Sequence, residues 1–172
     1  MSNVLQTVAE LMEISAITAP KAAGKDYLVT KILNEAECQQ LGKEMITYGQ
    51  ETGKKNFDRD GANVEHSAAV LLIGMKNAAP VGLNCGACGL AKCLQINTGE
   101  KGSEFLGPQC LFRVLDLGIA LGSAVKTAST LNIDNRIMYR IGTVARKLKF
   151  IDADFVMGIP LSVSGKNIYF DR

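Results

Sequence analysis

The most constraining feature of this chain is a set of four cysteines with the spacing C-x2-C-x4-C-x16-C. They are Cys85, Cys88, Cys93 and Cys110. Three thiols in a tight loop, closed by a more distant fourth, can supply the four thiolates of a four-iron–four-sulfur (4Fe-4S) cluster. Small residues within Asn84–Gly89 let the backbone wrap closely and turn its N–H groups toward sulfur. Pro108 stiffens the approach to the fourth cysteine. The pattern therefore favours an iron–sulfur site.

Two other uses of these thiols stay open at the level of sequence. Structural zinc usually takes two separated C-x2-C knuckles, and this chain has one. The thiols could also hold no metal. A disulfide framework is disfavoured, because the chain of 172 residues has an odd number of cysteines and Met1–Glu13 does not read as a secretory signal.

Composition bounds the class of protein. The length predicts one domain, residues 1–172, in which residues 84–110 form the cluster-binding segment. A net charge of +2 gives no electrostatic case for nucleic acid, and no apolar run reaches the length of a membrane helix. Five cysteines without an export signal suit a reducing cytoplasm. An oxygen-sensitive cluster would further suggest anaerobic metabolism.

Hydrophobic periodicity predicts an α+β domain of layered α/β architecture, with helices and strands interleaved along the chain. Helices are expected over residues 4–15, 36–51 and 111–131, and from a cap at Asp134 or Asn135 to residue 149. Strands are expected over residues 27–33, 68–75 and 155–161, the last ended by Pro160. The polar stretch 53–63 is predicted to be a solvated loop.

The long helix over residues 111–131 is apolar around most of its circumference, which predicts burial. Gly118 and Gly122 lie four residues apart and would let another backbone approach closely. Burial of this kind fits a central core helix and a helix shared with a second subunit equally well.

Other candidate chemistry is weak. Gly24-Lys25 does not complete a phosphate loop, because Asp26 follows where Ser or Thr is needed. Lys21 and Lys25 could meet an anion, and a flexible connector with solvated lysines is the simpler interpretation. His66, the single histidine, is expected to be structural, and Cys38 a bystander outside the motif.

Over its whole length the chain resembles a family of uncharacterised ferredoxin domain-containing proteins. The matching pieces are Asn84–Gly89, Leu115–Ala120, Gly158–Leu161 and Gly165–Arg172. That family has no established reaction, so this resemblance implies an iron–sulfur cluster and little more.

A second resemblance is to the flavin-dependent nitroreductase fold. It rests on Ala19-Pro20, on the Asp-x-Gly-x-Ala pattern of Asp116–Ala120, and on Gly158–Pro160. It implies a nitroreductase-like domain with a Cys-rich insert, a homodimer, and FMN at the subunit interface. The N-terminal basic motif for the FMN phosphate is missing here, whereas Lys166 and Arg172 fall near where C-terminal phosphate ligands would lie.

Two classes of function follow from these observations. One is a 4Fe-4S electron-transfer protein that serves a redox partner or, with FMN, acts as an oxidoreductase. The other is a non-enzymatic regulatory or binding protein in which a cluster or zinc ion is structural.

Overall fold

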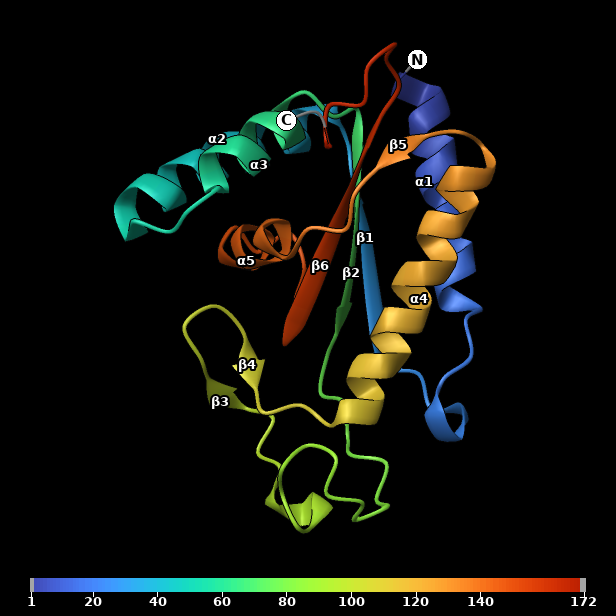
Figure 1. The fold of residues 1–172 in the computed structure, drawn as a ribbon, viewed down its shortest axis with the longest axis vertical. Helices are drawn as coiled ribbons and strands as arrows, with labels where there is room; N and C mark the ends of the chain where they lie inside the picture. Colours follow the sequence, from blue (N-terminus) through green and yellow to red (C-terminus); the bar gives the residue numbers. More distant parts are fainter. Residues whose placement is uncertain (1, 171–172) are drawn as a thin grey trace.

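The computed structural model describes residues 2–170, and its centre is a four-stranded antiparallel sheet (Figure 1). The strands follow the order β1-β2-β6-β5 across the sheet. Their bounds are β1 Leu28–Leu33, β2 Ala69–Met75, β5 Asp134–Asn135 and β6 Phe155–Ser162. The predicted strands therefore exist, and β5 is an addition that the sequence did not indicate.

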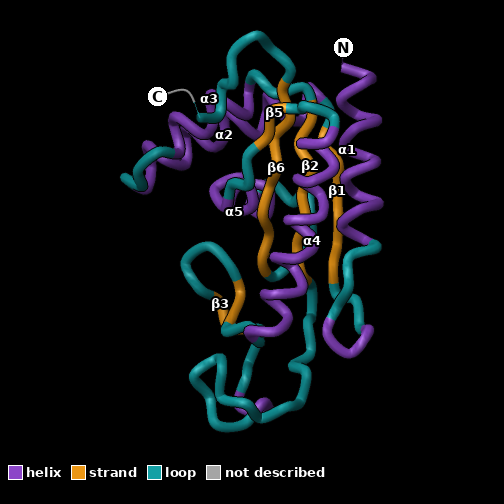
Figure 2. Tube along the Cα trace, turned by 45° about the vertical axis from the view of Figure 1, so that its right-hand side comes forward, coloured by secondary structure: helices purple, strands orange, loops and turns teal. Residues whose placement is uncertain are grey.

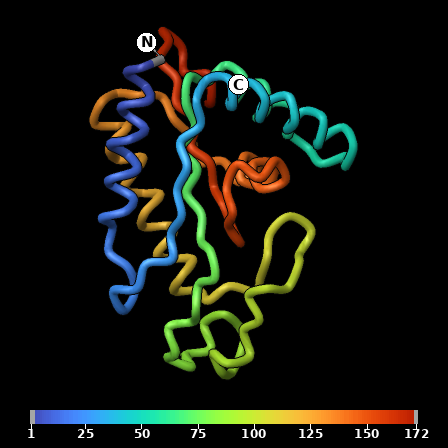
Figure 3. Tube along the Cα trace, turned by 180° about the vertical axis from the view of Figure 1, so that it is seen from behind, coloured from blue at the N-terminus to red at the C-terminus, as the bar shows by residue number. Residues whose placement is uncertain are grey.

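Helices cover both faces of this sheet, as Figures 1 and 3 show. One face carries α1 (Ser2–Ile17) and α4 (Leu111–Thr130), which pack side by side. The other face carries α2 (Glu35–Thr52), α3 (Phe57–Glu65) and α5 (Tyr139–Lys147). This arrangement confirms the layered α+β expectation. In the part of the chain that the structure describes, no helix is both long and apolar enough to cross a membrane.

Strand β2 is buried along its whole length because both of its faces are covered. Leu71 and Ile73 pack into the core beneath α1 and α4, whereas Val70 and Leu72 pack into the core beneath α2, α3 and α5. Each fully buried side chain of this size contributes about 1.5–3 kcal/mol to folding. A strand with no solvent face needs no alternation, which explains its continuous apolar sequence.

The prediction of a solvated loop over residues 53–63 is wrong, because α3 begins at Phe57. Phe57, Asp60 and Val64 fall at helical spacing and are all buried. The charged residue Asp60 interrupts the apolar pattern of this buried face, so the sequence suggests a polar segment. Its carboxylate is paired with Arg59 at 2.6 Å and with Arg140 at 2.8 Å.

The predicted start of the last helix is also wrong. Asp134–Asn135 form β5 instead of a helix cap, and α5 begins only at Tyr139. The backbone N–H of Met138 donates to Gly158 O at 2.8 Å, which keeps the chain extended until that point.

Pro160 does not end β6, which continues to Ser162. Gly158 N donates to Met138 O, and N–H groups alternate along a strand, so the nitrogen of Pro160 faces the same side. On that side the ladder is interrupted between Asn135 and Met138. A missing donor is tolerated there.

Helix α5 crosses β6 through two glycines. A Cβ on Gly142 would lie 1.9 Å from Val156 O, and a Cβ on Gly158 would lie 2.0 Å from Ile141 Cγ2. Neither atom can move freely, because both lie in the core. These positions fix how closely the helix approaches the sheet.

Replacing Gly142 with alanine is expected to lower the free energy of unfolding by about 3 kcal/mol, because the added methyl overpacks a rigid contact. Gly165→Ala is the matched control, since its Cβ would meet no heavy atom within 4 Å and its φ is not positive. That control should gain up to about 1 kcal/mol, because alanine restricts the unfolded chain more than glycine does. Urea denaturation measures both, and equal midpoints for the two variants would contradict this packing.

Candidate functional site

The cysteine-rich segment connects β2 to α4 and lies beyond one end of the sheet (Figures 1 and 2). It is mostly irregular. Its regular elements are the short 3-10 helix η2 (Cys93–Gln95) and a small hairpin of β3 (Glu100–Lys101) and β4 (Leu106–Gly107). The 4Fe-4S ligands predicted from the sequence all belong to this segment or its junction with α4.

The first three cysteines lie on the open part of the segment. Cys85 is exposed, and Cys88 and Cys93 are half-buried. Asn84 closes the loop that contains them: its backbone N–H donates to Cys93 Sγ at 3.3 Å, and its Oδ1 accepts from Cys93 N at 2.9 Å. Gly86 and Gly89 have φ of 71° and 85°, which permits the tight turns between the thiols.

The fourth cysteine is in a different environment. Cys110 is 5% exposed and is the N-cap residue of α4, where its carbonyl accepts from Arg113 N at 3.0 Å. Within residues 2–170, no three His, Cys, Asp or Glu side chains are grouped so that they could hold a metal ion. The structure therefore places the cysteines in one segment and does not bring three of them into one ready-made site.

Next to Cys110, the side chain of Gln109 has an unsatisfied end. Its Nε2 donates to Leu106 O at 3.2 Å, but its Oε1 is buried without a partner among the residues described. Leaving a buried polar atom unpaired costs about 1–3 kcal/mol. The Gln109 oxygen is thus an acceptor without a protein donor beside the fourth cysteine.

A buried arginine ties the segment to the rest of the protein. Arg113 is 2% exposed; its Nε donates to Ala79 O at 2.9 Å, and its Nη1 donates to Ala22 O at 2.8 Å. The same guanidinium pairs with Asp116 at 3.0 Å, and Asp116 Oδ1 accepts from Ala22 N at 2.7 Å. The start of the cysteine-rich segment, the loop after α1 and α4 are therefore joined at one point. Sequence reasoning missed Arg113, although a cation in an apolar helix was the available signal.

Lys21 is not available for an anion. Its side chain is 8% exposed, and its ammonium donates to Ala16 O and Ile17 O at the end of α1. Lys21 is therefore neither an anion ligand nor a solvated lysine of a flexible connector, the two interpretations that the sequence offered. Lys25 is exposed, and its carbonyl accepts a bond from Arg113.

Of the two basic residues suggested for a flavin phosphate, the one that the structure describes, Lys166, lies away from the cysteines. Lys166 is exposed and follows the Ser162 end of β6. The cysteine-rich segment follows Met75, which pairs with Phe155 at the other end of β6. Arg172 lies outside the described residues.

The two remaining candidates have structural positions. Burial raises the pKa of the Cys38 thiol to about 12, so it stays protonated and inert at neutral pH. His66 caps α3, with its Nδ1 2.7 Å from Ala62 O.

Helix α4 is not buried all round, contrary to the expectation. Its outer side is an apolar stripe at helical spacing, with Leu115 50% and Ile119 48% exposed. Gly118 and Gly122 lie on the same side, and a Cβ on either would meet only open space. Helix α1, which packs beside α4, also carries exposed apolar residues, including Ile14, and we name the exposed apolar residues of both helices the α1–α4 face.

Comparison with solved structures defines the class of fold. The chain superposes on nitroreductase A from Vibrio parahaemolyticus with a TM-score of 0.59 and 12% identity, covering 94% of this chain and 59% of that one. A nitroreductase with bound FMN from Bacteroides fragilis superposes with a TM-score of 0.61 and 9% identity, covering 92% of this chain and 77% of that one. A nitroreductase with bound FMN from Desulfitobacterium hafniense superposes with a TM-score of 0.56 and 14% identity, covering 95% of this chain and 78% of that one. The protein has the nitroreductase fold, and it spans less than two thirds of the Vibrio enzyme.

Sequence comparison defines the family. Residues 106–172 match the family described as "Uncharacterized protein containing a ferredoxin domain (DUF2148)". An uncharacterized protein of Archaeoglobus fulgidus is 48% identical over 169 residues, which cover 98% of this chain and 91% of that protein. The chain belongs to this family of ferredoxin-domain proteins.

Replacing Arg113 with lysine is expected to cost about 3 kcal/mol of stability, because one ammonium cannot reproduce the forked contacts of the guanidinium. Release of Ala79 should also speed proteolysis within residues 80–109. Arg140→Lys is the control, since Arg140 pairs with Asp60 on the other face of the sheet. Urea denaturation and limited proteolysis test this. Cleavage of the segment at the same rate in both variants would contradict the anchoring role.

Proposed function

We propose that this protein is a 4Fe-4S electron-transfer protein whose cluster is held by Cys85, Cys88, Cys93 and Cys110. The observation that carries the proposal is the concentration of four free thiols in one irregular segment, residues 84–110, of a ferredoxin-domain protein. Irregular backbone is suited to this task, because a cluster imposes its own geometry on the ligand loop.

The residues present fit such a group by their chemistry. Four thiols match the ligand set of a cubane cluster, and the Asn84 N–H already donates to the sulfur of Cys93. Cys110 stands at the N-terminus of a 20-residue helix, whose dipole favours negative charge at that end.

When bound, the cluster would supply one-electron chemistry. The chain's own residues set its surroundings. Hydrogen bonds to sulfur and the burial of Cys110 would tune the reduction potential, while the exposed Cys85 side leaves access for a partner. Arg113 holds the two ends of the segment together through Ala79 and the first turn of α4.

A flavin is the second part of the proposal. Two of the fold neighbours are nitroreductases with bound FMN, and Lys166 and Arg172 are the residues we propose for its phosphate. With about 3.3 Å per residue, the eight residues of β6 separate Lys166 from the cysteines by more than about 20 Å in one protomer. A flavin-linked oxidoreductase therefore depends on assembly with a second subunit.

We propose that the second subunit is another copy of this chain, docked through the α1–α4 face. The apolar stripe on α4 exposes Leu115 and Ile119 by about half, and its two glycines permit close approach of helices. We also propose that the protein works in a reducing cytoplasm in anaerobic metabolism, where a redox protein supplies or accepts the electrons.

The alternative is a regulatory or binding protein with a structural cluster or zinc ion. The observation that favours it is the anchoring of the segment by Arg113, which a folding role would also require. Zinc bound to the purified protein, with unfolding of residues 84–110 on chelation and no redox titration, would select this alternative.

Substituting Cys88 with serine is expected to abolish the visible absorbance of the cluster and most of the bound iron, because one of four thiolates is lost. Cys38→Ala is the matched control and should keep both, since this buried thiol lies in the α2 core. Anaerobic purification, a visible absorbance spectrum and iron analysis make the test. Unchanged iron in Cys88→Ser would sink the ligand assignment.

Introducing a negative charge at Leu115 should disrupt the dimer, because each subunit would then bury an unpaired carboxylate in the apolar interface. Leu115→Glu is expected to weaken the dimer Kd by about 100-fold or more. Val163→Glu changes an exposed apolar residue outside the α1–α4 face and should have no effect. Analytical ultracentrifugation measures both. A monomeric wild-type protein, or a Leu115→Glu dimer as tight as wild type, argues against this interface.

A further inference from the structure

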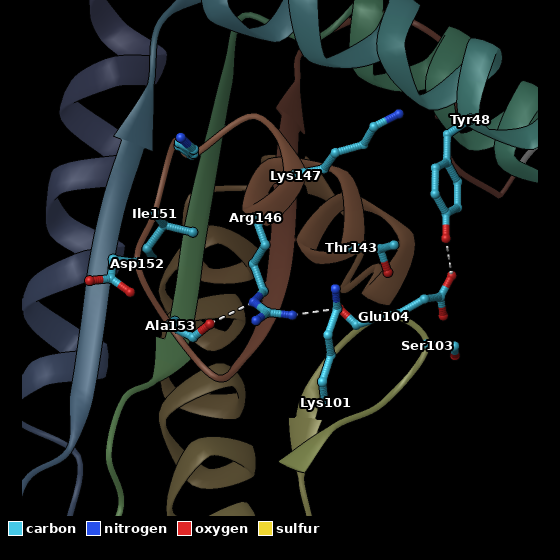
Figure 4. A pocket seen from close by; sticks show the side chains of 11 residues that line it. Tyr48, Lys101, Ser103, Glu104, Thr143, Arg146, Lys147, Ile151, Asp152 and Ala153 are labelled. Atoms are coloured by element: carbon cyan, nitrogen blue, oxygen red, sulfur yellow. Dashed lines mark hydrogen bonds between the residues drawn. The ribbon is translucent and has the colours of Figure 1, made fainter. Parts of the chain in front are cut away.

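A cleft with a volume of about 780 Å³ lies between the β3–β4 hairpin and α5, on the side of the sheet covered by α2 (Figure 4). Its walls come from separate parts of the chain: Tyr48 from α2, Lys101 and Glu104 from the hairpin, Arg146 from α5, and Ala153 from the loop before β6. Nothing in the redox proposal uses this cleft, and none of its lining residues is a cysteine.

The acidic groups of the cleft are already engaged. The Glu104 carboxylate pairs with Lys54 at 2.7 Å and accepts from the Tyr48 hydroxyl at 3.3 Å. Asp152 pairs with Lys76. The Glu104 carboxylate is therefore engaged, whereas Asp152, together with Asp154, still offsets part of the charge of Arg146.

Several cations of the cleft lack such compensation. Lys101 and Lys149 form no side-chain hydrogen bond or ion pair with any residue in the described range 2–170. Lys147 has a loose contact of 3.6 Å with Glu51, and its ammonium lies 5.5 Å from the ring centroid of Tyr48. The cleft as a whole carries an excess of positive charge, supplied by two elements that are remote in sequence.

Arg146 gives the cleft a fixed floor. Its Nε donates to Ala153 O at 2.6 Å and its Nη1 to Glu104 O, as the dashed lines of Figure 4 show. Burial lowers the pKa of this guanidinium, although it remains charged at neutral pH. A cation held by two backbone carbonyls is positioned in advance of any ligand.

The shape and lining indicate a small molecule in preference to a protein surface. The volume falls in the range of ligand pockets, about 300–1,000 Å³. Ile151 and Ala153 are buried apolar wall residues. The Ser103 hydroxyl can donate or accept, and the Thr143 hydroxyl, which donates to Tyr139 O at 3.4 Å, can accept. Apolar walls with a few convergent polar groups are typical of sites for organic ligands.

We infer that this cleft binds a small organic anion with at least two negative charges, carried by phosphate or carboxylate groups. Lys101 and Lys149 contact the charged groups, and Arg146 adds its positive field from below. The ligand would bridge the hairpin to α5. The hairpin is already fastened there by Leu106 N, which donates to Asp154 O at 2.9 Å, and by Phe105, whose ring centroid lies 4.6 Å from that of Phe155.

The test is isothermal titration calorimetry of the full chain at low ionic strength, with pyrophosphate and citrate as separate probes. At least one probe should bind at one site per chain. Tighter binding of pyrophosphate than of citrate indicates a phosphate ligand, and tighter binding of citrate indicates a polycarboxylate. The double variant Lys101→Gln/Lys149→Gln should weaken Kd by about tenfold.

The control is Lys25→Gln/Lys43→Gln, which removes the same charge from exposed lysines elsewhere. It should leave Kd unchanged within about twofold, since such distant charges are screened. Failure of both probes to saturate one site, an unaffected Lys101→Gln/Lys149→Gln variant, or an equal loss in the control would each overturn the inference. Because no cysteine takes part, this outcome is independent of whether the protein holds a cluster.

Discussion

The buried ion pair between Arg113 and Asp116 joins the segments from which the candidate site is built. Removing both charges from water is costly, and the cost is offset here because the guanidinium and carboxylate also bond to backbone groups of Ala22 and Ala79. The loop after α1, the start of the cysteine-rich segment and α4 cannot shift independently. Cys110, one turn before this pair, is thereby held in place while the other three cysteines stay on open backbone.

Because only the ends of the cysteine-rich segment are anchored, the fold accepts an insert that is irregular over most of its length. Both cores are built mainly from the sheet and five helices, as Val70 and Leu71 on opposite faces of β2 illustrate. The segment adds its hairpin to the α5 side and leaves its thiols outward. The nitroreductase fold supplies the frame, and the chemistry belongs to the insert, because a fold does not by itself fix a function.

The sequence predicted most of the frame because its signals are local. Residues 69–75 are continuously apolar, and α1, α2 and α4 repeat with helical period, so their positions followed directly. Long-range partners were invisible. Asp60 makes the α3 sequence resemble a solvated loop, because its partner Arg140 is remote in sequence. The backbone hydrogen bonds between Met138 and Gly158 keep the chain extended, so α5 begins later than its sequence suggests. The cysteine spacing indicated the chemistry, whereas the arrangement of the thiols depends on a group that local patterns do not describe.

The most direct test of the central claim is the metal and sulfide content of the anaerobically purified chain, together with its visible spectrum before and after dithionite. If the chain holds a 4Fe-4S cluster, we expect about four irons and four acid-labile sulfides per chain, and a broad absorbance that bleaches on reduction. A colourless protein that contains zinc, or no metal at all, would contradict it and leave the four cysteines with a structural role.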